Sequence, residues 1–150
     1  MTVDPTRVCE VLLVDDDAAD IALITEAFAN HHARVRLHTA GDGIEALAFL
    51  RREDTHELAP RPDLILLDLN MPRMDGREVL AAVKNDTELG AIPVVVFTTS
   101  QRAEDVTASY IRHANAYVTK PLDLDELDTV IAKIYDFYGD LVTRPRTAVP

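Results

Sequence analysis

Carboxylate side chains follow two short apolar runs of the chain at the point where each run ends. Asp15 and Asp16 come directly after Val11–Val14, and Asp68 comes directly after Leu64–Leu67. Clustered carboxylates repel one another and need a counter-charge. Oxygen ligands with no Cys or His beside them favour a hard cation, and a site of few carboxylates completed by water suits Mg²⁺ better than Ca²⁺. These residues therefore predict a magnesium site.

A hydroxyl and an ammonium group follow two later apolar runs. Thr98 comes after Val94–Phe97, and Lys120 comes shortly after Ala116–Val118. Mg²⁺ usually accompanies phosphate, but neither GxxxxGK[ST] nor GxGxxG occurs among the five glycines, which disfavours a bound nucleotide or dinucleotide. A carboxylate beside a metal can instead act as a nucleophile and form an aspartyl phosphate, with Mg²⁺ and a lysine neutralising the transferred group.

The elements that must position these groups alternate regularly between strand and helix. Five apolar runs predict strands, and the segments between them have helical periodicity; the runs are Val11–Val14, Val35–Leu37, Leu64–Leu67, Val94–Phe97 and Ala116–Val118. This alternation predicts an α/β fold, a doubly wound five-stranded parallel sheet in the order 2-1-3-4-5 with helices on both faces (flavodoxin-like). Ligands bind such sheets at the carboxyl ends of the strands. Strand 5 lies about 10 Å from strand 3, so the long side chain of Lys120 can reach Asp68.

Helical periodicity also predicts which side chains each helix buries. In the second helix Ile44, Leu47 and Ala48 share one face. The last helix has a wider apolar stripe of about 160°, which exceeds what one core contact requires; its members are Leu124, Leu127, Val130, Ile131, Ile134, Tyr135, Phe137 and Tyr138. The excess predicts a homodimer through the face formed by the fourth helix, strand 5 and the last helix. The alternative is an apolar helix covered by the C-terminal tail.

Composition sets limits on the classes of protein that remain. The 150 residues suit one domain, which we expect over residues 8–140 with a C-terminal tail over 141–150. The net charge of −11 disfavours binding to nucleic acid or to an anionic membrane surface. The single cysteine, Cys9, reads as a core residue, and no apolar run is long enough for a signal peptide or a membrane span. We expect a cytoplasmic location.

Four ordered strings resemble the signature blocks of two-component response regulator receiver domains of the chemotaxis type. They are VLLVDDD at 11–17, LILLDLNMPRMDG at 64–76, VVVFTT at 94–99 and AYVTKP at 116–121. The resemblance covers about residues 9–138. The longer connections 51–61 and 85–93, together with the tail, resemble the single-domain regulators that partner bacterial phytochrome histidine kinases.

The resemblance implies a function for the acidic residues. Asp68 would accept a phosphoryl group from a partner sensor histidine kinase, possible donors including a bacterial phytochrome. Asp16, Asp68 and the backbone carbonyl of Asn70 would bind Mg²⁺ directly, and Asp15 would act through metal-bound water. No output domain follows the receiver, so the protein would be a phosphoacceptor in signalling, with no enzymatic activity beyond its own phosphorylation from small donors and its own dephosphorylation.

The resemblance also implies how the phosphate is sensed. Lys120 would contact one phosphoryl oxygen, and Thr98 would swing its hydroxyl onto another. Tyr117 would turn inward when Thr98 moves. These shifts would switch the face formed by the fourth helix, strand 5 and the last helix.

Other interpretations stay open beside this one. Asp17 directly precedes a helix and is assigned to capping it, not to the site. The chain could be a receiver-shaped interaction module that is never phosphorylated, or an aspartyl-nucleophile phosphatase, although that enzyme would favour a second acid at position 70, where this chain has Asn70. The histidines lie outside the strand ends, so the donor histidine must belong to another protein.

Overall fold

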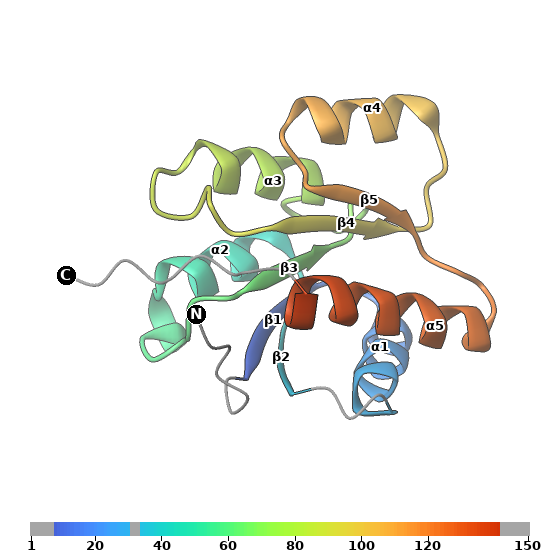
Figure 1. The fold of residues 1–150 in the computed structure, drawn as a ribbon. Helices are drawn as coiled ribbons and strands as arrows, with labels where there is room; N and C mark the ends of the chain where they lie inside the picture. The colour runs from blue at the N-terminus through green and yellow to red at the C-terminus, as the bar shows by residue number, and fades with distance from the viewer. Residues whose placement is uncertain (1–7, 31–33, 142–150) are drawn as a thin grey trace.

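A computed structural model of the chain describes residues 8–30 and 34–141 and has a single five-stranded sheet among them (Figure 1). All strand pairs are parallel, and the order is β2-β1-β3-β4-β5. The strands are β1 Cys9–Val14, β2 Val35–Ala40, β3 Leu64–Leu67, β4 Val94–Thr98 and β5 Ala116–Thr119. The predicted fold class and strand order are confirmed.

A helix follows each strand, as the alternating pattern predicts. The helices are α1 Ala18–Asn30, α2 Gly43–Arg51, α3 Gly76–Asn85, α4 Ala103–Ile111 and α5 Leu124–Tyr135. A short 3₁₀ helix, Asp54–His56, lies between α2 and β3, and α5 passes into a π-helical segment, Asp136–Leu141. Helices α1 and α5 pack together on one face of the sheet, and α2 and α3 cover the other (Figure 1).

The sheet separates two hydrophobic cores. Successive side chains of a strand point to opposite faces, so Leu12 and Val14 of β1 contact the core beneath α2 and α3, whereas Val11 and Leu13 contact the core beneath α1 and α5. All of β3 is buried as well. Burial of each large aliphatic side chain contributes about 1.5–3 kcal/mol. The central strands therefore form a rigid support for the residues at their ends.

The predicted face of the second helix is buried only in part. Leu47 is 7% exposed, as predicted, whereas Ile44 is 52% exposed. The hydrophobic residues that α2 buries are Ala46, Leu47, Phe49 and Leu50. Helix α2 begins at Gly43, directly after its cap at Asp42, so Ile44 lies in the first turn at the rim of the sheet.

The last helix has the apolar excess that its wide stripe predicts. Leu127, Ile131 and Ile134 are buried, whereas Leu124 is 60% exposed. Phe137, which lies just beyond α5 in the π-helical segment, is 48% exposed. Part of the stripe therefore faces outward.

Capping residues set where the helices begin at the rim. The Asp17 side chain accepts hydrogen bonds from the backbone N–H groups of Ala19 and Asp20, at 2.8 and 3.2 Å, which confirms its assignment as a cap. Asp42 and Asp75 cap α2 and α3 in the same way. Each of these helices therefore starts close to the carboxyl end of the strand before it.

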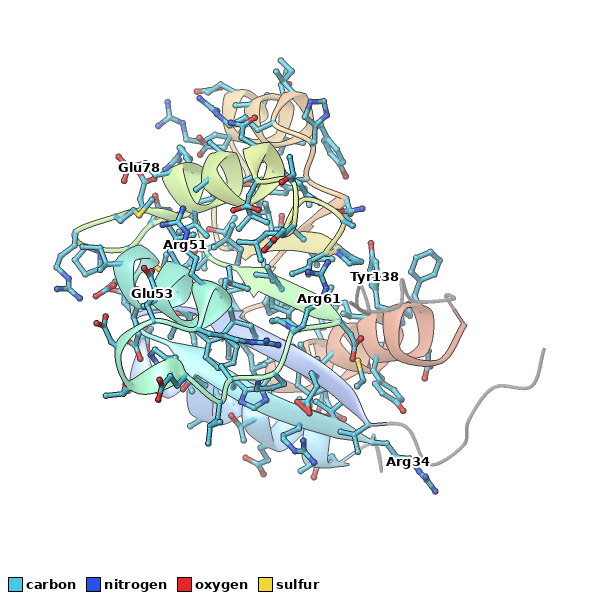
Figure 2. All side chains as sticks on the ribbon, turned by 90° about the vertical axis from the view of Figure 1, so that its left-hand side faces the viewer. Arg34, Arg51, Glu53, Arg61, Glu78 and Tyr138 are labelled. Carbon is cyan, nitrogen blue, oxygen red and sulfur yellow. The ribbon has the colours of Figure 1, made fainter. Side chains whose placement is uncertain are left out.

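Figure 2 shows that Arg34 and Glu78 point away from the body of the protein. Within the described part of the chain, no helix has both the length and the apolar character that a membrane crossing needs.

Candidate functional site

The carboxyl ends of β1 and β3 bring the predicted acidic residues together. Val14 lies beside Leu67 in the parallel register, and the backbone N–H of Asp68 donates to the carbonyl of Val14 at 2.9 Å. Carboxylate oxygens of Asp15, Asp16 and Asp68 all lie within 4.8 Å of one another. The register of the two strands therefore builds a three-carboxylate cluster.

Lys120 reaches this cluster from β5, as its length predicts. Its Nζ lies 2.5 Å from Asp15 Oδ2, 3.0 Å from Asp20 Oδ2 and 3.6 Å from Asp68 Oδ2. The side chain is only 6% exposed. A buried ammonium group is therefore shared among three carboxylates, two of which belong to the predicted site.

Burial and charge act against each other at this cluster. Burial raises the pKa of the Asp15 carboxyl above its ordinary value, although hydrogen bonds from Lys120 and from the Asp17 backbone N–H act in the opposite direction. Burial alone would lower the pKa of Lys120, but its hydrogen bond to Asp15 and the charges of Asp68 and Asp15 raise it overall. Lys120 therefore stays protonated. Its single positive charge cannot balance the three carboxylates around it.

The donor set fits a hard divalent cation. The three carboxylates lie close enough together for one ion to contact all of them, and every candidate ligand atom is an oxygen. Additional positive charge would also favour the ionised form of Asp15, whose burial opposes ionisation.

Thr98 lies at the end of β4 with its hydroxyl unsatisfied. Its Oγ1 is the one buried side-chain oxygen or nitrogen in the described part of the chain without a hydrogen-bond partner. Buried hydroxyl groups normally have a partner. Thr98 shares this end of the sheet with Lys120, whose backbone N–H donates to the Thr98 carbonyl at 2.7 Å. The hydroxyl is thus free to bind a further acceptor.

Tyr117 is half-buried on β5 and is bonded to the segment after β4. Its hydroxyl donates to the carbonyl of Ser100 at 2.8 Å. The hydroxyl of Ser100 donates to Asp105 of α4 at 2.6 Å, and Arg77 of α3 donates to the same carboxylate at 2.9 Å. Tyr117 is therefore connected to both α3 and α4 through Ser100, Asp105 and Arg77.

The loop after Asp68 is held to α2. Arg73 donates through Nε to Asp42 Oδ2 at 2.9 Å, and the N–H of Gly43 donates to the carbonyl of Met74 at 3.0 Å. Asn70 is exposed in this loop, and its N–H lies 3.5 Å from Asp68 Oδ1. Binding of the metal by the Asn70 backbone carbonyl stays a prediction.

Sequence reasoning missed two contributors to this end of the sheet. Asp20 is in the first turn of α1, where acidic residues are common because they favour the positive end of the helix dipole. It lies three residues after the cap Asp17, at the end of α1 that faces the rim, and this placement could have suggested a contact there. Arg73 gave no such signal, because its partner Asp42 is distant in sequence.

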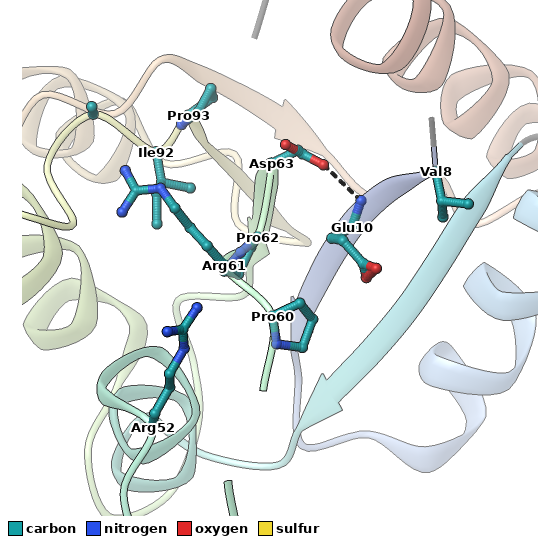
Figure 3. A pocket seen from close by; sticks show the side chains of 10 residues that line it. Val8, Glu10, Arg52, Pro60, Arg61, Pro62, Asp63, Ile92 and Pro93 are labelled. Carbon is teal, nitrogen blue, oxygen red and sulfur yellow. Dashed lines mark hydrogen bonds between the residues drawn. The ribbon is translucent and has the colours of Figure 1, made fainter. Parts of the chain in front are cut away.

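A hollow of about 220 Å³ lies at the end of the sheet opposite to the acidic cluster (Figure 3). Glu10 and Asp63 line it where β1 and β3 begin, and the N–H of Glu10 donates to Asp63 at 2.9 Å. Arg52 and Arg61 also line it, so its charges are balanced. None of the predicted site residues belongs to this hollow.

Two features together define the receiver class of proteins. One is a parallel sheet in the order 2-1-3-4-5, and the other is an acidic cluster with a lysine beside it at the carboxyl ends of the strands. The family model described as "Response regulator receiver domain" matches residues 11–132, and the chain belongs to this family.

Individual relatives place the chain more narrowly within the family. Response regulator Rcp1 of Synechocystis sp. is 45% identical over 135 residues, which cover 90% of this chain and 92% of the relative. The phosphorylated cyanobacterial phytochrome response regulator RcpA superposes with a TM-score of 0.89 at 46% identity, covering 93% of this chain and 100% of that one. The Mn²⁺-bound form of Rcp1 superposes with a TM-score of 0.86 at 44% identity, covering 92% and 99%. The chain is thus a receiver homologous to phytochrome response regulators, and one of these relatives, Rcp1, binds a divalent cation, Mn²⁺.

Proposed function

We propose that this response regulator accepts a phosphoryl group on Asp68 from a partner histidine kinase. The observation that carries the proposal is the surroundings of Asp68, a buried carboxylate that lies close to two further carboxylates and 3.6 Å from the ammonium of Lys120. Carboxylates are seldom buried, because burial of a charge is costly, so this placement favours a chemical role for Asp68.

The chemistry follows from these neighbours. One carboxylate oxygen of Asp68 attacks the phosphorus atom and forms a new P–O bond, while the P–N bond of a phosphohistidine donor breaks with its electron pair on the imidazole nitrogen. Lys120 neutralises negative charge on the transferred group, and the free hydroxyl of Thr98 donates to one of its oxygens. Hydrolysis of the acyl phosphate by water restores Asp68.

The cation that we propose is Mg²⁺, held by Asp16 and Asp68 with the carbonyl of Asn70, while Asp15 binds through water. Bound Mg²⁺ would neutralise charge that develops on the phosphoryl oxygens. An oxygen-only donor set supports this choice, and the Mn²⁺-bound structure of Rcp1 supports a divalent ion of similar chemistry.

Phosphorylation would be sensed through Thr98 and Tyr117. Movement of the Thr98 hydroxyl toward the phosphoryl group would alter the segment after β4, to which Tyr117 is bonded through the Ser100 carbonyl. The face formed by α4, β5 and α5 would then change between two states.

The partner that we propose is a sensor histidine kinase of the bacterial phytochrome type. RcpA, whose fold and sequence this chain shares over most of its length, is described as a cyanobacterial phytochrome response regulator. The receiver over 8–140, the tail over 141–150 and the cytoplasmic location stay predictions; residues 142–150 lie outside the described part of the chain.

Acetyl phosphate tests the proposed function directly. Incubation with acetyl phosphate and Mg²⁺ should add one phosphoryl group per chain, detected by intact-mass spectrometry and mapped to Asp68 by borohydride trapping. The same incubation with EDTA should add none, because Lys120 alone cannot offset the charges of the cluster. A chain that takes up no phosphate with Mg²⁺ present would support the interaction module, and turnover of a stable phosphoester would support the phosphatase.

We also propose a homodimer through the face formed by α4, β5 and α5. Exposed apolar side chains lie on α4, with Ile111 at 70% and Tyr110 at 48% exposure. Size-exclusion chromatography with light scattering should give twice the monomer mass, and Ile111→Asp should give the monomer. A wild-type monomer at high concentration, with and without phosphorylation, would exclude the dimer.

A further inference from the structure

Lys120 has an unexpected second partner in Asp20 of α1. Nζ lies 3.0 Å from Asp20 Oδ2, closer than the 3.6 Å that separates it from Asp68. Asp20 does not belong to the cluster of acidic residues that could share one cation in the described part of the chain. Its carboxylate therefore interacts with the lysine and is not a candidate metal ligand.

The two carboxylates that bind Lys120 differ in what their release would cost. Asp15 is completely buried and already accepts a hydrogen bond from the Asp17 backbone at 2.9 Å. Removing the ammonium group from Asp15 would leave a buried charge unpaired, which is strongly destabilising. Asp20 is 35% exposed and lines a hollow of about 120 Å³ beside Lys120, so water can replace the lysine there.

Lys120 Nζ donates to Asp15 and Asp20 and lies 3.6 Å from Asp68 Oδ2, so a phosphoryl group on Asp68 has to compete with these two carboxylates for the position of the ammonium group. From these contacts we infer that Asp20 is a positioning residue that holds Lys120 before phosphorylation and gives it up to the phosphoryl group. The inference rests on the proposed function, because it requires Lys120 to bind phosphate attached to Asp68. Asp20 thus makes the unphosphorylated site more stable and lowers the affinity for a phosphoryl group.

Replacing Asp20 with Asn keeps its size and one acceptor oxygen but removes the charge that competes for Lys120. Asp20→Asn should therefore raise the affinity for beryllofluoride with Mg²⁺, measured by NMR titration, by about threefold, and raise the rate of phosphorylation by acetyl phosphate similarly. Hydrolysis of the acyl phosphate should change by less than about twofold, because Lys120 has already left Asp20 in the phosphorylated protein.

Asp17→Asn is the matched control. It removes the same charge from the same turn of the chain, keeps a good helix cap and leaves the contacts of Lys120 unchanged. The inference is supported if Asp20→Asn binds beryllofluoride more tightly than Asp17→Asn and is phosphorylated by acetyl phosphate faster. The rate at which Asp20→Asn loses its phosphate by hydrolysis should be unchanged. It is overturned if the two variants are alike, if Asp20→Asn binds or reacts more weakly than wild type, or if hydrolysis changes as much as formation. Failure of the wild-type protein to be phosphorylated at all would instead overturn the proposed function.

Discussion

Asp68→Asn should abolish phosphoryl uptake from acetyl phosphate while the protein remains folded. The amide cannot form the acyl phosphate, and no neighbouring carboxylate occupies the same place at the end of β3. Intact-mass spectrometry should show no added phosphate under conditions that fully modify the wild type. Asp17→Asn removes the same charge from the residue next to Asp16 and should be modified normally.

The same variant should lose stabilisation by the cation. Wild-type protein at a Mg²⁺ concentration of 100 times the dissociation constant should gain about 2.7 kcal/mol in free energy of unfolding. Asp68→Asn should lose most of this increment, because one of three carboxylates that can share the ion is gone, and its stability without metal should stay within about 1 kcal/mol of wild type. Phosphate uptake that persists in Asp68→Asn would show that another residue is the acceptor.

The positions of Asp68, Asp15 and Lys120 could be predicted from the sequence because each follows a strand whose burial makes its ends unambiguous. Continuous apolar runs give parallel central strands, and the topology then determines which ends meet. The position of Thr98 beside Thr119 and the approach of Lys120 to Asp68 follow from the same register.

Contacts from helices and loops could not be predicted in this way. Asp20 approaches Lys120 from a helix whose rotation depends on packing against α5, and periodicity does not specify that rotation to within one residue. The exposed Ile44 shows the same uncertainty in α2. Arg73 pairs with Asp42 across a loop whose path depends on a positive φ of 62° at Arg73 itself, which a non-glycine residue seldom adopts.

Gly76 marks the closest approach of backbones beneath the site. A Cβ added there would lie 2.0 Å from the carbonyl oxygen of Asp68 and 2.8 Å from Leu69 Cα. No described glycine has a positive φ, so Gly76 is required for space and not for backbone conformation. Its N–H also donates to the carbonyl of Leu69 at 3.0 Å, which holds the start of α3 against the residue after Asp68.

Gly76→Ala should therefore lower the free energy of unfolding by about 3 kcal/mol, because both groups in the clash are backbone and neither can rotate away. Urea denaturation measures this loss. Phosphorylation by acetyl phosphate should also slow in the fraction that remains folded, since the carbonyl that must move belongs to Asp68.

Gly41→Ala is the matched control at the same rim. A Cβ at Gly41 would meet only Glu45 Oε2 at 3.6 Å, an ordinary contact, so this variant should change stability by less than about 1 kcal/mol. Equal effects of the two substitutions would mean that α3 can withdraw from β3 without cost. The geometry around Asp68 would then depend on the carboxylates and Lys120 and not on the backbone contact at Gly76.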